Sequence, residues 1–156
     1  MSTDSVRAIA FDVDGTLVEE NFWLRLHEFF GVSPEDDERW MRMYHEEVFT
    51  YREWMDTVAG AYRKNPRKRD EVERILSSFT FLPGAEAAVR KLQAKYPVAL
   101  ISSNIDTYVE RVARTLSIDE WHAFSFFAYD RDGKFSHIGY KGEGSELDAK
   151  VESVKS

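Results

Sequence analysis

Two aspartates with the spacing of a reactive pair follow a short apolar segment near the start of the chain. Asp12 and Asp14 stand directly after residues 9–11, and Gly15 and Thr16 come next. Open α/β sheets bind ligands at the carboxyl ends of their strands, where these carboxylates would lie. One could act as a nucleophile and the other as a proton donor and acceptor. Gly15 would let the chain leave the strand in a backbone conformation that residues with a Cβ disfavour. The alternative interpretation of the segment is a strand followed by an ordinary Asp-Gly turn.

Ser102 and Ser103 form the second candidate group, because they follow a continuous apolar run at 98–101. That run is typical of a buried parallel strand, and the periodicity of residues 105–116 predicts a helix after it. A hydroxyl beside the free N–H groups of a new helix suits a phosphate oxygen. Alternatively, either serine merely caps the helix. Since the two apolar strands are expected to be neighbours, Ser102 should lie beside Asp12.

A lysine late in the chain could supply the positive charge that a phosphoryl group needs. Ser145 is expected to cap a final helix, and Lys150 then falls one turn into it. Lys141 is the competing candidate, since it stands in a glycine-bearing loop. Either lysine could neutralise the phosphoryl group and a carboxylate nucleophile. For each of them the alternative is an ordinary surface position.

Residues 20–79 carry apolar side chains at helical spacing, which predicts four short helices without strands. Such a region, inserted directly after the first strand, is more typical of a small helical cap than of sheet-crossover helices. Its aromatic side chains are expected to pack in the core of that cap. The predicted helix boundaries are Gly31 after the first helix, Ser33 and Pro34 before the second, Thr50 and Glu53 as a capping box of the third, and Asn65 and Pro66 after it.

The remaining residues alternate between helical and strand patterns. We expect a strand at 6–11, a helix at 85–96 and a strand at 124–129, and Asp132-Gly133 is a hairpin signal between 126–129 and 135–138. This β-α-β-α-β order predicts an α/β fold with a parallel, Rossmann-like sheet and right-handed crossovers. The predicted organisation is a core domain of residues 1–18 and 81–156, into which a helical cap of residues 19–80 is inserted.

The composition limits the classes of partner. The net charge of −7 argues against a nucleic-acid binder, which needs a basic surface. The chain has no cysteine, which excludes disulfides, thiolate metal sites and cysteine nucleophiles. The first seven residues are polar and no apolar run approaches the length of a membrane span, so we expect neither a signal peptide nor a membrane partner. A cytoplasmic location is compatible with these features.

These motifs together resemble the haloacid dehalogenase superfamily. Asp12-Val13-Asp14-Gly15-Thr16 is similar to the first motif of that family, Ser102 after its strand to the second, and Lys150 to the third. A helical insertion directly after the first motif resembles the cap of the phosphoserine-phosphatase-like branch.

The resemblance implies Mg²⁺-dependent hydrolysis of a small phosphorylated metabolite through an aspartyl-phosphate. It makes Asp12 the nucleophile and Asp14 the acid and base. The Asp12 carboxylate and the Asp14 carbonyl would hold Mg²⁺. Phosphate oxygens would be held by the remaining motif residues, which are Gly15, Thr16, Ser102, Ser103 and Lys150.

Two departures from the family pattern qualify this implication. Asn21 stands where serine-specific members carry a glutamate, and no acidic fourth motif follows Lys150. We therefore expect weak Mg²⁺ binding and slow turnover, and an open sheet edge beside the first strand that favours self-association. The alternative function is a catalytically weak or inactive fragment, or a non-enzymatic phosphate-binding protein.

Overall fold

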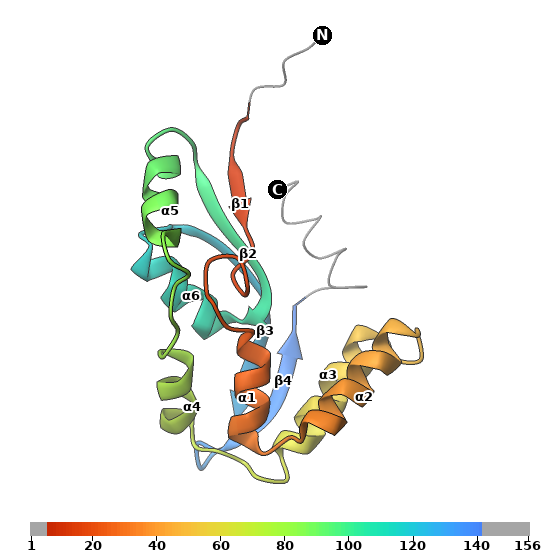
Figure 1. The fold of residues 1–156 in the computed structure, drawn as a ribbon. Coiled ribbons are helices and arrows are strands. Elements are labelled where there is room, and N and C mark those ends of the chain that lie inside the picture. The colour runs from red at the N-terminus through yellow and green to blue at the C-terminus, as the bar shows by residue number, and fades with distance from the viewer. Residues whose placement is uncertain (1–5, 142–156) are drawn as a thin grey trace.

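The computed structural model describes residues 6–141, which form a sheet flanked and capped by helices (Figure 1). The elements follow one another as β1 (Ile9–Phe11), α1 (Phe22–Phe30), α2 (Pro34–His45), α3 (Tyr51–Tyr62), α4 (Arg69–Leu76), α5 (Ala85–Gln93), β2 (Val98–Ile105), α6 (Asp106–Thr115), β3 (Glu120–Tyr129) and β4 (Phe135–Tyr140).

The sheet has four strands in the order β1-β2-β3-β4 within the described range. Strands β1, β2 and β3 run parallel, and β4 returns antiparallel after a turn in which Gly133 adopts a φ of 73°. The predicted α/β, Rossmann-like fold is therefore confirmed, as is the Asp132-Gly133 hairpin. Among the described residues β1 pairs only with β2, which leaves it at an edge of the sheet.

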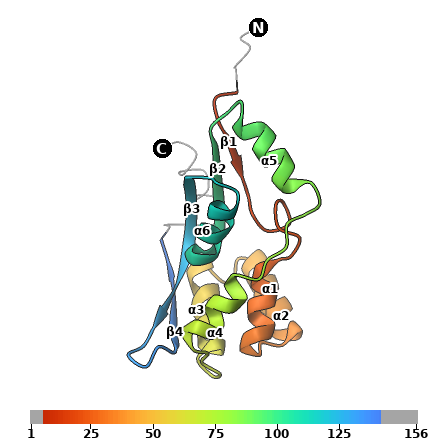
Figure 2. The same ribbon diagram turned by 90° about the vertical axis from the view of Figure 1, so that its left-hand side faces the viewer.

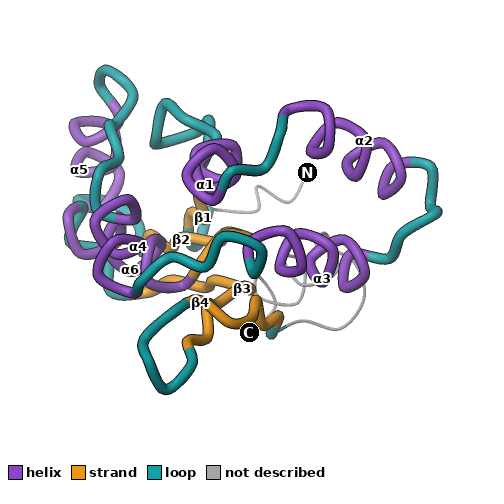
Figure 3. Tube along the Cα trace, turned by 90° about the horizontal axis from the view of Figure 1, so that it is seen from below, coloured by secondary structure: helices purple, strands orange, loops and turns teal. Residues whose placement is uncertain are grey.

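Helices α1 to α4 lie together at one end of the sheet, and α5 and α6 pack along its strands (Figures 1 and 2). Local signals set their ends. Gly31 ends α1 in the left-handed conformation, with a φ of 81°. The Ser33 hydroxyl caps α2, and Thr50 and Glu53 form the predicted capping box of α3. Seen from below, α2 and α3 extend to one side of the molecule and α4, α5 and α6 to the other (Figure 3).

The β3–β4 hairpin reaches into the group of helices and shares a core with them. Phe30 of α1 and Tyr62 of α3 stack with ring centroids 3.9 Å apart. Phe135 lies 5.1 Å from Phe30 and 5.4 Å from Tyr62, and Phe127 completes this aromatic cluster at 5.1 Å from Phe135. The helices and the sheet are thereby joined through buried rings, each pair of which adds to the energy of area burial.

Strand β2 is longer than the sequence predicts. Apolar residues end at 101, but pairing with β3 continues to Ile105, and α6 begins at Asp106 rather than at the serines. The expectation that Ser102 or Ser103 opens or caps a helix is therefore wrong. The register with β3 shifts between Ser102 and Ile105, and side-chain bonds occupy backbone groups there: Ser102 Oγ accepts from the Asn104 N–H at 3.1 Å, and Asn104 Oδ1 accepts from the Ile105 N–H at 2.7 Å. Strand β3 also starts earlier than predicted, because Glu120 already pairs with β2.

Candidate active site

Asp14 lies just past the carboxyl end of β1, and three donors from different parts of the chain bind its side chain. Oδ2 accepts from the backbone N–H of Phe22 at 2.9 Å and from Asn104 Nδ2 at 2.8 Å. Oδ1 accepts from the hydroxyl of Tyr108 at 2.8 Å. These bonds fix the carboxyl group in position at the edge of the sheet where ligands bind in open α/β folds.

A tight turn brings the first of these donors to Asp14. Gly15 has a φ of 68°, and its N–H donates to the Val18 carbonyl at 2.8 Å, as the chain doubles back after β1. The next residues lead into α1, whose N-terminus points a free N–H, that of Phe22, at the carboxylate. A helix N-terminus carries partial positive charge and favours an anionic partner.

The other two donors are held rigidly. Asn104 is buried at the end of β2, where its backbone and side-chain oxygen are already bonded as described above. Tyr108 is fully buried on α6, and its ring stacks on Phe22 with centroids 4.1 Å apart. Phe79 packs edge-on against the same ring at 5.8 Å. The hydroxyl of Tyr108 therefore has little freedom to leave Asp14.

The surroundings of Asp14 favour its protonated form. Burial raises the pKa of Asp14 above its ordinary value, the three hydrogen bonds oppose that shift, and the negative charge of Asp12 adds to it. Burial and the nearby Asp14 carboxylate also raise the pKa of Tyr108, so the phenol remains a neutral donor. A carboxyl group with a raised pKa is suited to deliver a proton and take it back.

Asp12 lies in a different environment from Asp14. It is exposed to solvent, and its Oδ1 accepts from the Val13 N–H at 2.8 Å. An exposed carboxylate can meet an incoming ligand, whereas Asp14 is half-buried and held by α1, β2 and α6. The two aspartates that the sequence identifies thus differ in exposure and in hydrogen bonding.

The predicted phosphate-binding residues differ in exposure and in their distance along the chain from Asp14. Ser102 is buried and is joined to Asp14 through Asn104, whereas Ser103 is half-buried. Gly15 and Thr16 lie exposed on the turn after β1. Lys141 pairs with Asp106 at the start of α6, where its Nζ lies 3.0 Å from Oδ2. The predicted helix cap at Ser145 and Lys150 lie outside the described residues.

Sequence reasoning missed three of the groups that hold Asp14, namely Asn104, Tyr108 and the N-terminus of α1. Asn104 had a usable signal, since it is a third polar residue directly after an apolar run. Tyr108 had none, because an aromatic residue one turn into an amphipathic helix is ordinarily a core residue.

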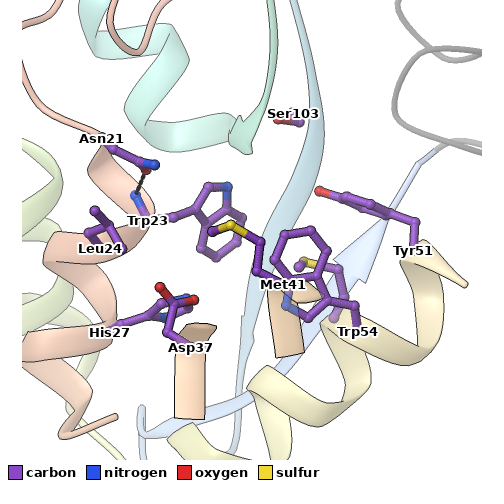
Figure 4. A pocket seen from close by; sticks show the side chains of 10 residues that line it. Asn21, Trp23, Leu24, His27, Asp37, Met41, Tyr51, Trp54 and Ser103 are labelled. Atoms are coloured by element: carbon purple, nitrogen blue, oxygen red, sulfur yellow. Dashed lines mark hydrogen bonds and ion pairs between the residues drawn. The ribbon is translucent and has the colours of Figure 1, made fainter. Parts of the chain in front are cut away.

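A small cavity opens between the helices and the end of β2 (Figure 4). Its volume is about 80 Å³. Trp23 and Trp54 face each other across it with Met41 between them, and Ser103 lies on the sheet side. We call it the inner cavity. It is lined by Asn21, Trp23, Leu24, His27, Asp37, Met41, Tyr51, Trp54, Met55 and Ser103.

Within residues 6–141, no three histidine, aspartate or glutamate side chains gather as a metal-binding group. The oxygen groups that the first motif offers are the exposed Asp12 carboxylate and the backbone carbonyl of Asp14. This set fits Mg²⁺, which is commonly held by one or two carboxylates and completes its shell with water and substrate phosphate. In the same part of the chain, no helix has the length and apolar character of a membrane span.

Comparison with known proteins identifies relatives in both sequence and fold. The family model described as haloacid dehalogenase-like hydrolase matches residues 9–156. A phosphoserine phosphatase from Archaeoglobus fulgidus is 30% identical over 114 residues, which cover 72% of this chain and 32% of that protein. The chain therefore spans about a third of the length of this curated relative.

Solved structures of similar fold include two of phosphoserine phosphatase, one with an analogue of the phospho-aspartyl intermediate and one with substrate bound. They superpose with a TM-score of 0.71 each, at 22% and 21% identity, and cover 86% and 87% of this chain but 63% of theirs. A phosphoserine phosphohydrolase-like protein from Francisella tularensis superposes with a TM-score of 0.72 at 16% identity, covering 96% of this chain and 73% of its own. At these identities the superpositions establish the fold.

Proposed function

This chain belongs to the haloacid dehalogenase-like hydrolase family, and on that premise we propose that it hydrolyses small phosphate monoesters through an aspartyl-phosphate on Asp12. The observation that carries the proposal is the pairing of an exposed Asp12 with a half-buried Asp14 held by three donors. The two carboxyl groups stand one residue apart at the end of β1 and differ in the way that a nucleophile and a proton carrier should differ.

In the first proposed step, a carboxylate oxygen of Asp12 attacks phosphorus and the bond from phosphorus to the alcohol oxygen breaks. Asp14, whose pKa burial raises above its ordinary value, is proposed to deliver a proton to the departing oxygen. In the second step a water molecule attacks the phosphorus of the aspartyl-phosphate and passes a proton to Asp14. The bond between phosphorus and Asp12 breaks, inorganic phosphate leaves, and both aspartates return to their starting states.

The phosphate ligands are proposed from the second and third motifs and from the turn after β1. Ser102 Oγ already accepts from the Asn104 N–H, which leaves its hydrogen to donate to a phosphate oxygen. Ser103, Gly15 and Thr16 are proposed to add hydroxyl or backbone donors. Lys150 is proposed as the cation, since Lys141 is paired with Asp106.

Mg²⁺ is the proposed cofactor, with the Asp12 carboxylate and the Asp14 backbone carbonyl as its protein ligands. When bound, it would withdraw charge from the phosphoryl oxygens and reduce their repulsion of the Asp12 carboxylate. The protein groups retain their own tasks, which are attack by Asp12 and proton transfer by Asp14.

Residues 19–80 are proposed to be a cap inserted into a core of residues 1–18 and 81–156. The two connections of the inserted segment support this division, because they run side by side. The Glu19 N–H donates to the Thr80 carbonyl at 3.0 Å, and the Leu82 N–H donates to the Leu17 carbonyl at 2.9 Å. A segment that leaves and returns at one point has the connections expected of an insertion.

The test is release of inorganic phosphate from p-nitrophenyl phosphate, with and without Mg²⁺, by the chain and by Asp12→Asn. We expect Mg²⁺-dependent turnover that Asp12→Asn abolishes. Asp119→Asn is the matched control, because Asp119 is exposed in the loop before β3 and should leave activity unchanged. Turnover that persists in Asp12→Asn would refute the mechanism. Phosphate binding without turnover would favour a non-enzymatic phosphate-binding protein.

A further inference from the structure

We infer that the alcohol part of the substrate is an apolar chain that occupies the inner cavity, an inference that rests on the proposed function. The cavity is lined by chain neighbours of two of the groups that bind Asp14. Asn21 and Trp23 line it and flank Phe22, whose N–H binds Asp14. Ser103 also lines it and precedes Asn104, whose side chain binds the same carboxyl group. A departing alcohol that receives a proton from Asp14 would therefore leave toward this cavity.

Most of the lining is apolar, and Asn21, His27, Asp37 and Ser103 are its polar members. Two tryptophans, a tyrosine, two methionines and a leucine dominate it. None of the described residues that line it is a lysine or an arginine. Its one acidic residue, Asp37, is buried and pairs with His27 Nε2 at 3.2 Å. The carboxylate of an amino-acid substrate would thus enter without a cationic partner, whereas carbon atoms would be well accommodated.

The dimensions favour a slender chain. A volume of about 80 Å³ corresponds to about two to three water molecules at ~30 Å³ each, which is room for a few carbon atoms in a row. An outer groove of about 800 Å³ shares Leu24, His27, Asp37 and Met41 with the inner cavity. The outer groove is bordered further by the apolar Val32 and Pro34 and by the acidic Glu28 and Glu38.

The experiment uses two series of ligands with methyl, propyl and pentyl chains. Turnover of the n-alkyl phosphates and of O-phosphoserine gives kcat/KM in the presence of Mg²⁺. Binding of the matching n-alkylphosphonates, which cannot be hydrolysed, is followed by tryptophan fluorescence, since Trp23 and Trp54 line the inner cavity. Both series are expected to improve by about fourfold for each methylene group buried. O-phosphoserine should be a poorer substrate than pentyl phosphate.

Two variants should flatten this dependence on chain length. Met41→Gln keeps the length of the side chain and makes it polar at a residue that lines both cavities. Leu24→Asn does the same at a residue that is 50% exposed, so that folding is not endangered. Val48→Asn is the matched control, because Val48 is 59% exposed and lines neither cavity.

The outcomes separate the inference from the proposed function. Turnover without a dependence on chain length, or with O-phosphoserine as the best substrate, overturns the inference and leaves the proposed function intact. Phosphonate binding that follows chain length without any turnover supports the cavity assignment and overturns the proposed function. Binding that does not change with chain length overturns the inference whatever the turnover.

Discussion

Tyr108→Phe removes the donor of one hydrogen bond to Asp14 and little else. The ring that stacks on Phe22 stays, but the contact of 2.8 Å between the hydroxyl and Asp14 Oδ1 is lost. A hydrogen bond to a charged group contributes about 1.5–3 kcal/mol. In a chain of this length, that loss corresponds to a fall in Tm of about 3–12 °C at neutral pH.

The effect should depend on pH, because this bond lowers the pKa of Asp14 and burial raises it. A folded pKa above the unfolded value means that folding binds a proton, so this contribution to stability falls as pH rises above the ordinary value of 3.8. Tyr108→Phe raises the pKa of Asp14 further. The stability difference between wild type and variant should therefore be small where Asp14 is protonated in both, and should grow toward neutral pH.

Urea unfolding of wild type, Tyr108→Phe, Asp14→Ala and the double variant closes a thermodynamic cycle at each pH. We expect a coupling energy of about 1.5–3 kcal/mol at neutral pH that shrinks in acid. The basic limb of the pH profile of kcat/KM, which reports a protonated Asp14, should move to higher pH in Tyr108→Phe. If Tyr108→Phe destabilises wild type and Asp14→Ala equally at every pH, the proposed coupling between Tyr108 and Asp14 is refuted.

Two further predictions concern the helices and the turn. Burial lowers the pKa of His27 against the opposing effect of Asp37, so the stability of the fold should decrease as pH falls below about 6.5. His27→Gln should make Tm less dependent on pH between 7 and 5. An unchanged dependence of Tm on pH in this variant would contradict the prediction. Gly15→Ala and Gly133→Ala should each lose about 1–2 kcal/mol in denaturant unfolding, because both glycines have positive φ and open space around the added Cβ. Only Gly15→Ala should also lower kcat. Equal kcat values for the two variants would contradict a role of the Gly15 turn in catalysis.

Features set by neighbouring residues were predictable from the sequence. Gly31, the Ser33-Pro34 start, the Thr50–Glu53 capping box and the Asp132-Gly133 hairpin all depend on contacts within a few positions of the chain. Side chains and backbone at that range choose among few conformations, so the residue type alone decides. The helices at 20–79 and the strand before Asp12 were predicted for the same reason.

The extension of β2 and the partners of Asp14 could not be read from local pattern. Residues 102–104 lack strand propensity and are extended because β3 offers pairing partners across a register shift. Asn104 and Tyr108 are separated from Asp14 by 90 and 94 positions. The sequence identified Asp12 and Asp14 as candidate carboxylates, but the environment that distinguishes them arises only when distant elements pack together.

The attachment of the helices to the hairpin limits how this protein could be re-engineered. Exchange of residues 19–80 for a foreign module would remove Phe30 and Tyr62, and with them half of the aromatic cluster that covers Phe127 and Phe135. It would also remove the N–H of Phe22 from Asp14. A transplanted module must therefore bring its own aromatic face for the hairpin and a helix N-terminus aimed at the carboxyl group. Recombination between relatives should succeed only when the insertion and the hairpin are transferred together.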